Sequence, residues 1–168
     1  RSADAFVSLP ERSAIANRHP NATLVSIHVN AAANSPGADG VETFVLSREF
    51  SDTDRSRVAA SRFRANGDSS VQGKQALANL AVASRNRGPA LAGSLQHSLT
   101  RRLGEPDRGV KQKDLAVLRE TYFGPAVLVE VGFLTNPRSA DRMRTDQWRA
   151  RASEALCEGI CGFLQQPL

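Results

Sequence analysis

The chain has 168 residues and a formal net charge of +5, and 40% of its residues are hydrophobic. These values are ordinary for one globular domain with a single core. No stretch approaches the ~20 apolar residues that cross a bilayer, and no basic run interleaves with aromatic residues, so we expect neither a membrane span nor a nucleic-acid-binding protein.

Three elements are predicted in the first part of the chain. The segment from Leu9 to Arg18 suits a helix packed on a sheet, and a short apolar strand follows from Thr23 to Asn30. Small residues and turn formers separate this strand from the next one, Val41 to Leu46. His28 lies close to the end of the first strand, where a single histidine is more often a hydrogen-bonded core residue than a metal ligand.

The middle of the chain is predicted to be largely helical. Residues 48–64 carry many charges, and residues 65–70 have the composition of a loop. Two helices are predicted over residues 72–87 and 89–103, the first with an apolar stripe at spacings of three and four residues. A short strand is predicted over residues 115–118.

Glu130 interrupts the most distinctive apolar stretch of the sequence. Val127 to Pro137 is an apolar run bracketed by turn formers, which is typical of a strand buried on both faces, usually in a parallel sheet. A buried carboxylate is unfavourable unless it meets a cation or a reacting group, so Glu130 is either catalytic or paired with an arginine. Ligands bind at the carboxyl ends of strands in open α/β sheets, where both His28 and Glu130 fall.

A closing helix is predicted after Thr145 or Asp146, either of which can cap it. One face of this helix is apolar and comprises Trp148, Ala152, Ala155, Leu156, Ile160 and Phe163. Cys157 and Cys161 lie four residues apart in it, where a disulfide would be strained, so they are expected to be packing residues. The alternation of strands and helices predicts a single α/β domain with a mostly parallel central sheet and helices on both faces.

Five ordered motifs resemble those of a known family. They are Ser26 to Ala31, Gly40 to Phe44, Arg108 to Gln112, Val117 to Arg119 and Val127 to Pro137. Their series looks like that of the zinc-dependent N-acetylmuramoyl-L-alanine amidases, and the resemblance covers nearly the whole chain. It implies a hydrolase of the cell envelope, periplasmic or secreted, that cleaves the amide bond between N-acetylmuramic acid and L-alanine in peptidoglycan.

The resemblance also implies roles for individual residues. Zinc in that family is held by a histidine in a Gly-His-Gly-Gly turn, a glutamate on the next helix and the histidine of the Ser-Ile-His motif, which is His28 here. Glu130 matches the catalytic acid/base of the family. Asn30, Arg108 and Gln112 are candidates for substrate contact, and stabilisation of a loop or turn is the alternative for each of them.

Two of the three zinc ligands have no counterpart in the chain. It contains no Gly-His-Gly-Gly, and neither His19 nor His97 matches the missing ligand. One hypothesis is that residues 1–168 are an amidase-like catalytic domain without its first strands and helix, and that the complete enzyme binds zinc. The other is a non-catalytic peptidoglycan-binding or regulatory domain derived from that fold. The presence of both His28 and Glu130 favours the enzyme, because a binding module needs neither.

Residues 48–87 suggest a means of regulation. In some members of the resembled family an inserted helix occludes the zinc until a partner protein removes it, and these residues occupy the corresponding interval. The alternative is a charged, solvated surface helix with a loop. The resemblance therefore suggests an inhibitory lid and an activator protein that acts on it, in addition to peptidoglycan as the main partner.

Overall fold

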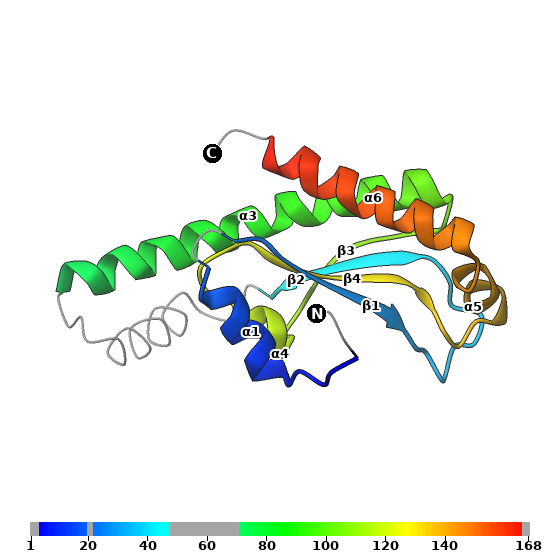
Figure 1. The fold of residues 1–168 in the computed structure, drawn as a ribbon, viewed down its shortest axis with the longest axis horizontal. Helices are drawn as coiled ribbons and strands as arrows, with labels where there is room; N and C mark the ends of the chain where they lie inside the picture. Colours follow the sequence, from blue (N-terminus) through cyan, green and yellow to red (C-terminus); the bar gives the residue numbers. More distant parts are fainter. Residues whose placement is uncertain (1–3, 20–21, 48–70, 166–168) are drawn as a thin grey trace. The chain divides into compact units, whose positions relative to one another are not determined.

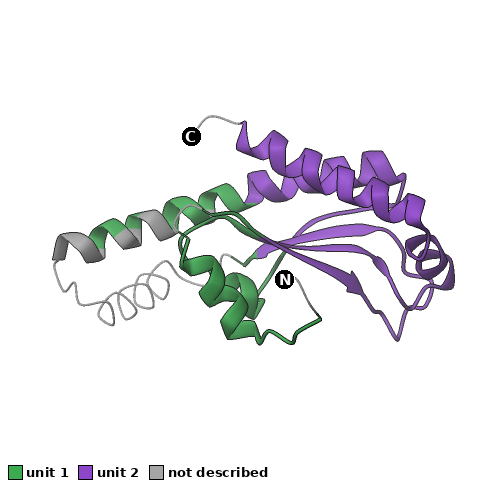
Figure 2. Cartoon of the chain, viewed as in Figure 1, with its two compact units in different colours: residues 1–24, 46–88, 112–126 green, residues 25–45, 89–111, 127–168 purple. Residues whose placement is uncertain are grey.

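The computed structural model describes residues 4–19, 22–47 and 71–165. The chain divides into two compact units, which Figure 2 shows in different colours. Unit 1 comprises residues 1–24, 46–88 and 112–126, and unit 2 comprises residues 25–45, 89–111 and 127–168. The charged segment over residues 48–64, the predicted loop over residues 65–70 and most of the proposed lid lie outside the described residues.

Five helices and four strands are described (Figure 1). In chain order they are α1 (Leu9–Asn17), β1 (Leu24–Asn30), β2 (Val41–Leu46), α3 (Val71–Leu103), β3 (Asp107–Lys113), α4 (Ala116–Arg119), β4 (Ala126–Phe133), α5 (Pro137–Met143) and α6 (Asp146–Leu164). Among the described residues, no helix is both long and apolar enough to cross a membrane.

The four strands form one sheet in the order β1-β4-β2-β3. β1 and β4 run parallel, because one hydrogen bond joins their starts (Leu24 N–H to Pro125 O, 2.9 Å) and another joins their ends (Leu134 N–H to Asn30 O, 2.8 Å). β2 and β3 also run parallel, since a backbone bond from the first residue of β2 to Pro106 joins their starts. The predicted α/β class with a mostly parallel sheet is therefore confirmed.

The central pair of strands departs from this pattern. β2 and β4 are antiparallel, and their register places Glu42 opposite Glu130. An apolar run indicates that a strand is buried on both faces but carries no information about its direction. The antiparallel pair brings the beginning of β2 beside the second half of β4.

One face of the sheet in unit 2 packs against α6 and the second half of α3. The buried cluster comprises Val41, Val45, Leu91, Ala92, Leu95, Leu99, Leu103, Val127, Val129, Val131, Ala152, Ala155 and Phe163. Gln96 of α3 is buried among these residues, but its side chain bonds to Thr43 and to the backbone of Val41. This core holds β2 and β4 in place and leaves the opposite face of the two strands to other side chains.

The closing helix agrees with its prediction. Thr145 caps α6 by accepting a hydrogen bond from the backbone N–H of Trp148, and the predicted apolar face packs against the core cluster. The two cysteines differ from the prediction, because Cys157 and Cys161 are exposed free thiols rather than packing residues. They lie on the side of α6 that the apolar stripe leaves to solvent.

Other elements also differ from the sequence prediction. The two helices predicted over residues 72–87 and 89–103 are one helix, α3, which continues through Pro89. Proline removes one helical hydrogen bond, but burial of side chains such as Leu91 and Leu95 stabilises the helix after it. The predicted strand at residues 115–118 is the short helix α4, because periodicity does not distinguish the two for so short an apolar run. The helix α5, capped by Asn136, was not predicted.

In unit 1, α1 contacts α4 and the turn after it. Asn17 at the end of α1 donates from its side chain to the backbone O of Glu120 (2.7 Å) and accepts from the backbone N–H of Tyr122 (2.8 Å). The start of α1 is fixed by a capping box between Ser8 and Glu11. These bonds fix both ends of a short helix.

Close approach of α6 to α3 requires a glycine at position 159. A Cβ atom there would lie 2.9 Å from the Cα atom of Leu95, whereas a Cβ atom on Gly93 of α3 would meet nothing within 4 Å. We predict that Gly159→Ala lowers the free energy of unfolding by about 1–3 kcal/mol through overpacking. Gly93→Ala, the matched control, is expected to raise it by up to about 1 kcal/mol because alanine favours helix. Urea unfolding measures both, and a Gly159→Ala protein at least as stable as wild type would contradict the packing.

Candidate functional site

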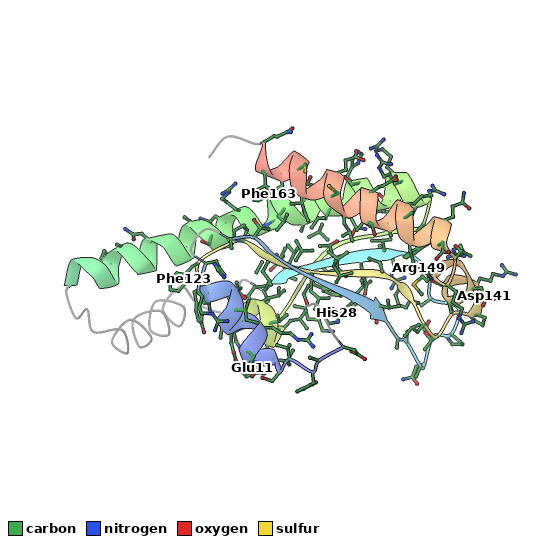
Figure 3. All side chains as sticks on the ribbon, viewed as in Figure 1. Glu11, His28, Phe123, Asp141, Arg149 and Phe163 are labelled. Carbon is green, nitrogen blue, oxygen red and sulfur yellow. The ribbon has the colours of Figure 1, made fainter. Side chains whose placement is uncertain are left out.

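A row of polar side chains runs along β1 on the face directed away from the core. Ser26, His28 and Asn30 alternate with Ile27 and Val29, so the three polar residues share one face of the strand. The Ser26 hydroxyl and Nε2 of His28 are 2.8 Å apart and form a hydrogen bond (Figure 3 labels His28). His28 is half-buried, which leaves its ring partly accessible from this side of the sheet.

Two glutamates lie on the same face of the two central strands. Glu130 of β4 and Glu42 of β2 are directly opposite in the antiparallel register, which places their Cα atoms roughly 4.5–5.5 Å apart. Like charges opposite each other destabilise a sheet unless other groups neutralise them. The residue Glu130 is half-buried and its Oε2 atom is buried, so this carboxylate has little solvent to stabilise its charge.

Glu42 is surrounded by hydrogen-bond donors. Asn30 donates from Nδ2 to Oε1 of Glu42 (2.8 Å). Oε2 accepts from Nε of Arg108 (2.8 Å) and from Nζ of Lys111 (2.5 Å). The Glu42 side chain is only 5% exposed, whereas Arg108 and Lys111 are 35% and 40% exposed. We call Asn30, Glu42, Arg108 and Lys111 the Glu42 network.

The ionised form of Glu42 is favoured by its partners. Burial alone would raise the pKa of Glu42, but the hydrogen bonds and charges of Lys111 and Arg108 together lower it below the ordinary glutamate value. Glu42 is therefore a fixed negative charge near neutral pH. With both oxygens occupied by donors, it is poorly suited to exchange protons with a substrate.

The start of β2 depends on a glycine that allows β3 to approach. Gly40 has a φ of +110°, and a Cβ atom there would lie 2.3 Å from the backbone O of Pro106. The next residue, Val41, donates its backbone N–H to that same oxygen (3.0 Å). Since Glu42 follows directly, Gly40 sets the position from which Glu42 meets the two cations of β3.

The structure brings together most of the predicted site residues. His28, Asn30 and Glu130 share one face of the sheet, and Arg108 joins this face through its bond to Glu42. Gln112 is exposed and belongs to unit 1, and it is not a member of the Glu42 network. Its predicted contact with substrate stays a prediction.

Sequence reasoning missed Glu42 and Lys111 as parts of the site. Glu42 interrupts the apolar strand Val41 to Leu46, which is the same signal that identified Glu130. A carboxylate within an apolar strand could therefore have identified Glu42 as well. That Glu42 lies opposite Glu130 depends on strand direction and register, which the sequence did not reveal. Lys111 carries no comparable signal, because a lysine on an exposed strand is ordinary.

The described residues do not complete a zinc site. No group of three His, Cys, Asp or Glu side chains that could hold a metal occurs in the described part of the chain. His28 offers one imidazole on the polar face, whereas His97 is exposed on α3 and His19 lies in unit 1 just after α1. A stable zinc site needs three or four protein ligands, so these residues alone do not fit the metal that the resemblance implies.

The chain matches a known family over almost its whole length. A family model described as N-acetylmuramoyl-L-alanine amidase matches residues 1–162. The uncharacterized protein YqiI of Bacillus subtilis is 30% identical over 166 residues, an alignment that covers 99% of this chain and 63% of that protein. The chain thus spans less than two thirds of this relative.

Solved structures agree with the match. The crystal structure of an N-acetylmuramoyl-L-alanine amidase from Clostridium difficile 630 superposes with a TM-score of 0.73 at 25% identity, covering 100% of this chain and 71% of that one. The CwlD amidase from Clostridioides difficile, solved in complex with the GerS lipoprotein, has the same fold, with a TM-score of 0.69 at 20% identity and coverage of 98% and 73%. By its sequence match over residues 1–162, the chain belongs to the N-acetylmuramoyl-L-alanine amidase family.

Proposed function

We propose that the protein containing this chain hydrolyses the amide bond between N-acetylmuramic acid and L-alanine in peptidoglycan, outside the cytoplasm. Family membership supports the reaction. The observation that carries it is the placement of Glu130, a half-buried carboxylate on the same polar face of the sheet as His28. A module that only binds peptidoglycan has no need of this pair.

Glu130 is the general base and then the general acid of the proposed reaction. Its carboxylate accepts a proton from a water molecule while the water oxygen forms a bond to the carbonyl carbon of the lactyl group. The C–N bond then breaks, and Glu130 returns the proton to the departing amine of L-alanine. Glu42 is poorly suited to this role, because three donors occupy its oxygens.

We also propose that His28 is one ligand of a zinc ion. Zinc supplies a polarised carbonyl and an activated water in hydrolases of this kind. The described residues provide one of the three ligands that such a site needs, so stable zinc binding depends on ligands outside them. Two observations support this proposal. His28 lies on the polar face of the sheet, and its Ser-Ile-His motif resembles the zinc-binding motif of the amidase family.

Substitution of Glu130 tests its proposed role in proton transfer. Glu130→Gln keeps the shape of the side chain but removes the basic group, so turnover of peptidoglycan should fall by about 10²–10⁴. Release of stem peptides from purified cell walls measures this rate. Glu154→Gln, an exposed carboxylate that pairs with Arg102 on the other face of unit 2, is the control and should keep wild-type turnover. Full activity of a folded Glu130→Gln protein would refute the assignment.

Substitution of His28 tests its proposed role as a zinc ligand. His28→Ala should lower the zinc content of the full protein, because removal of one of three ligands severely weakens zinc binding. Metal analysis after dialysis measures this, independently of activity. His97→Ala removes an exposed imidazole from α3 and should leave the zinc content unchanged. Equal zinc in wild type and His28→Ala would exclude His28 as a ligand.

We propose further that a partner protein controls access to the site through residues 48–87. The CwlD amidase, which has the same fold, was solved in complex with a lipoprotein, and this supports the idea of a protein partner. Deletion of residues 51–70 should raise turnover in the absence of any partner if this interval is inhibitory. Unchanged turnover of the folded deletion variant would refute an inhibitory role of this interval.

A further inference from the structure

We infer that Arg108 binds a carboxylate of the peptidoglycan stem peptide, and that Glu42 is the positioning residue that holds Arg108 for this contact. The inference rests on the proposed function and adds to it a recognised feature of the substrate. It follows from how the guanidinium group is fixed, which of its donors are occupied, and the charge of its surroundings.

Two contacts fix the guanidinium group of Arg108. Its Nε donates to Oε2 of Glu42 at 2.8 Å, and its Cζ lies 4.9 Å from the centroid of the Phe133 ring. Glu42 and Phe133 are both buried, with 4% and 2% of their surfaces exposed, so neither partner is free to move away. A hydrogen bond along the edge and an aromatic ring against the guanidinium together restrict its orientation.

The outer edge of Arg108 remains available. Among the described residues, its two terminal nitrogens make no hydrogen bond, and 35% of the side chain is exposed. Two parallel N–H donors on a planar group match the two oxygens of a carboxylate, and such bidentate pairs are among the stronger hydrogen bonds in proteins. A guanidinium already held by Glu42 loses less conformational freedom when it binds.

The charge around Arg108 favours an anion. Arg108 and Lys111 both contact the single carboxylate of Glu42, so the Glu42 network carries one more positive than negative charge. Among the described strand residues of this face, Glu130 is the other carboxylate, and it lies on the far side of β2 from β3. An acidic group of the substrate is therefore attracted toward the β3 side and repelled from the Glu130 side.

The sheet spacing indicates which part of the substrate is recognised. Neighbouring strands are ~4.8 Å apart, and β3 and β4 lie on either side of β2, so the strands that carry Arg108 and Glu130 are roughly 10 Å apart. An extended peptide covers ~3.5 Å per residue. With the scissile amide at Glu130, the group at Arg108 is a carboxylate on one of the first residues of the stem peptide.

The test compares peptidoglycan with the same material after its peptide carboxylates have been converted to carboxamides with carbodiimide and ammonia. For wild-type protein, the apparent KM for the unmodified polymer should be about 10–100-fold lower than the apparent KM for the amidated polymer. This difference is expected for a charge-assisted bidentate contact. Arg108→Lys keeps the charge but not the fork, so it should lose most of this preference through KM while kcat changes little. Glu42→Gln should lose part of the preference for the unmodified polymer.

The matched control is Arg102→Lys. Arg102 also pairs with carboxylates, Glu154 and Glu158, but it does so on α3 and α6, which cover the other face of the sheet. It should keep the wild-type preference. Melting temperatures of all variants separate loss of recognition from loss of folding.

Three results would overturn the inference. Equal apparent KM values of wild type for the two polymers would do so without any variant. An Arg108→Lys protein that keeps the full preference would show that Arg108 has only a structural role. Hydrolysis of neither polymer by wild type would refute the proposed function itself, and the inference with it, which distinguishes that failure from the other two.

Discussion

The site depends on the two ion pairs of the buried Glu42, which allow two glutamates to lie opposite each other in a β-sheet. Glu42 and Glu130 face each other across β2 and β4, an arrangement that repels when both are charged. Arg108 and Lys111 reach Glu42 from the neighbouring strand and stabilise its charge. Without these cations, one glutamate would have to take up a proton or turn away. The electrostatic environment of Glu130 therefore depends on Arg108 and Lys111, which contact Glu42.

The two faces of the sheet differ in the side chains that they carry. The face toward α3 and α6 is apolar and closely packed, to the point that a glycine at position 159 is needed between the helices. The other face carries His28, Asn30, Glu42 and Glu130, which come from three strands. Packing on the first face fixes the strand register, and the register fixes which polar side chains meet on the second. A shift of one residue between β2 and β4 would move Glu42 to the apolar side.

Much of this architecture could be predicted from sequence. Apolar runs predicted the strands that carry His28 and Glu130, and the stripe of α6 predicted the face that packs on the core. The antiparallel pairing of β2 with β4 could not be predicted, because burial alone does not reveal strand direction. For the same reason, the opposition of Glu42 and Glu130 was missed. Continuation of α3 through Pro89 was missed too, since tertiary packing there overrides a local signal.

The most direct test of this account is the titration of Glu42 followed by carboxyl carbon NMR. Its pKa is lowered, so the ionised side chain stabilises the fold above the unfolded pKa of Glu42, and this stabilisation is lost as pH falls through the folded value. We predict that Glu42 is still ionised at pH ~4.3, where an ordinary glutamate is half protonated, and that Arg108→Gln raises its midpoint. A midpoint at or above the ordinary value in wild type would contradict the ion pair on which the site depends.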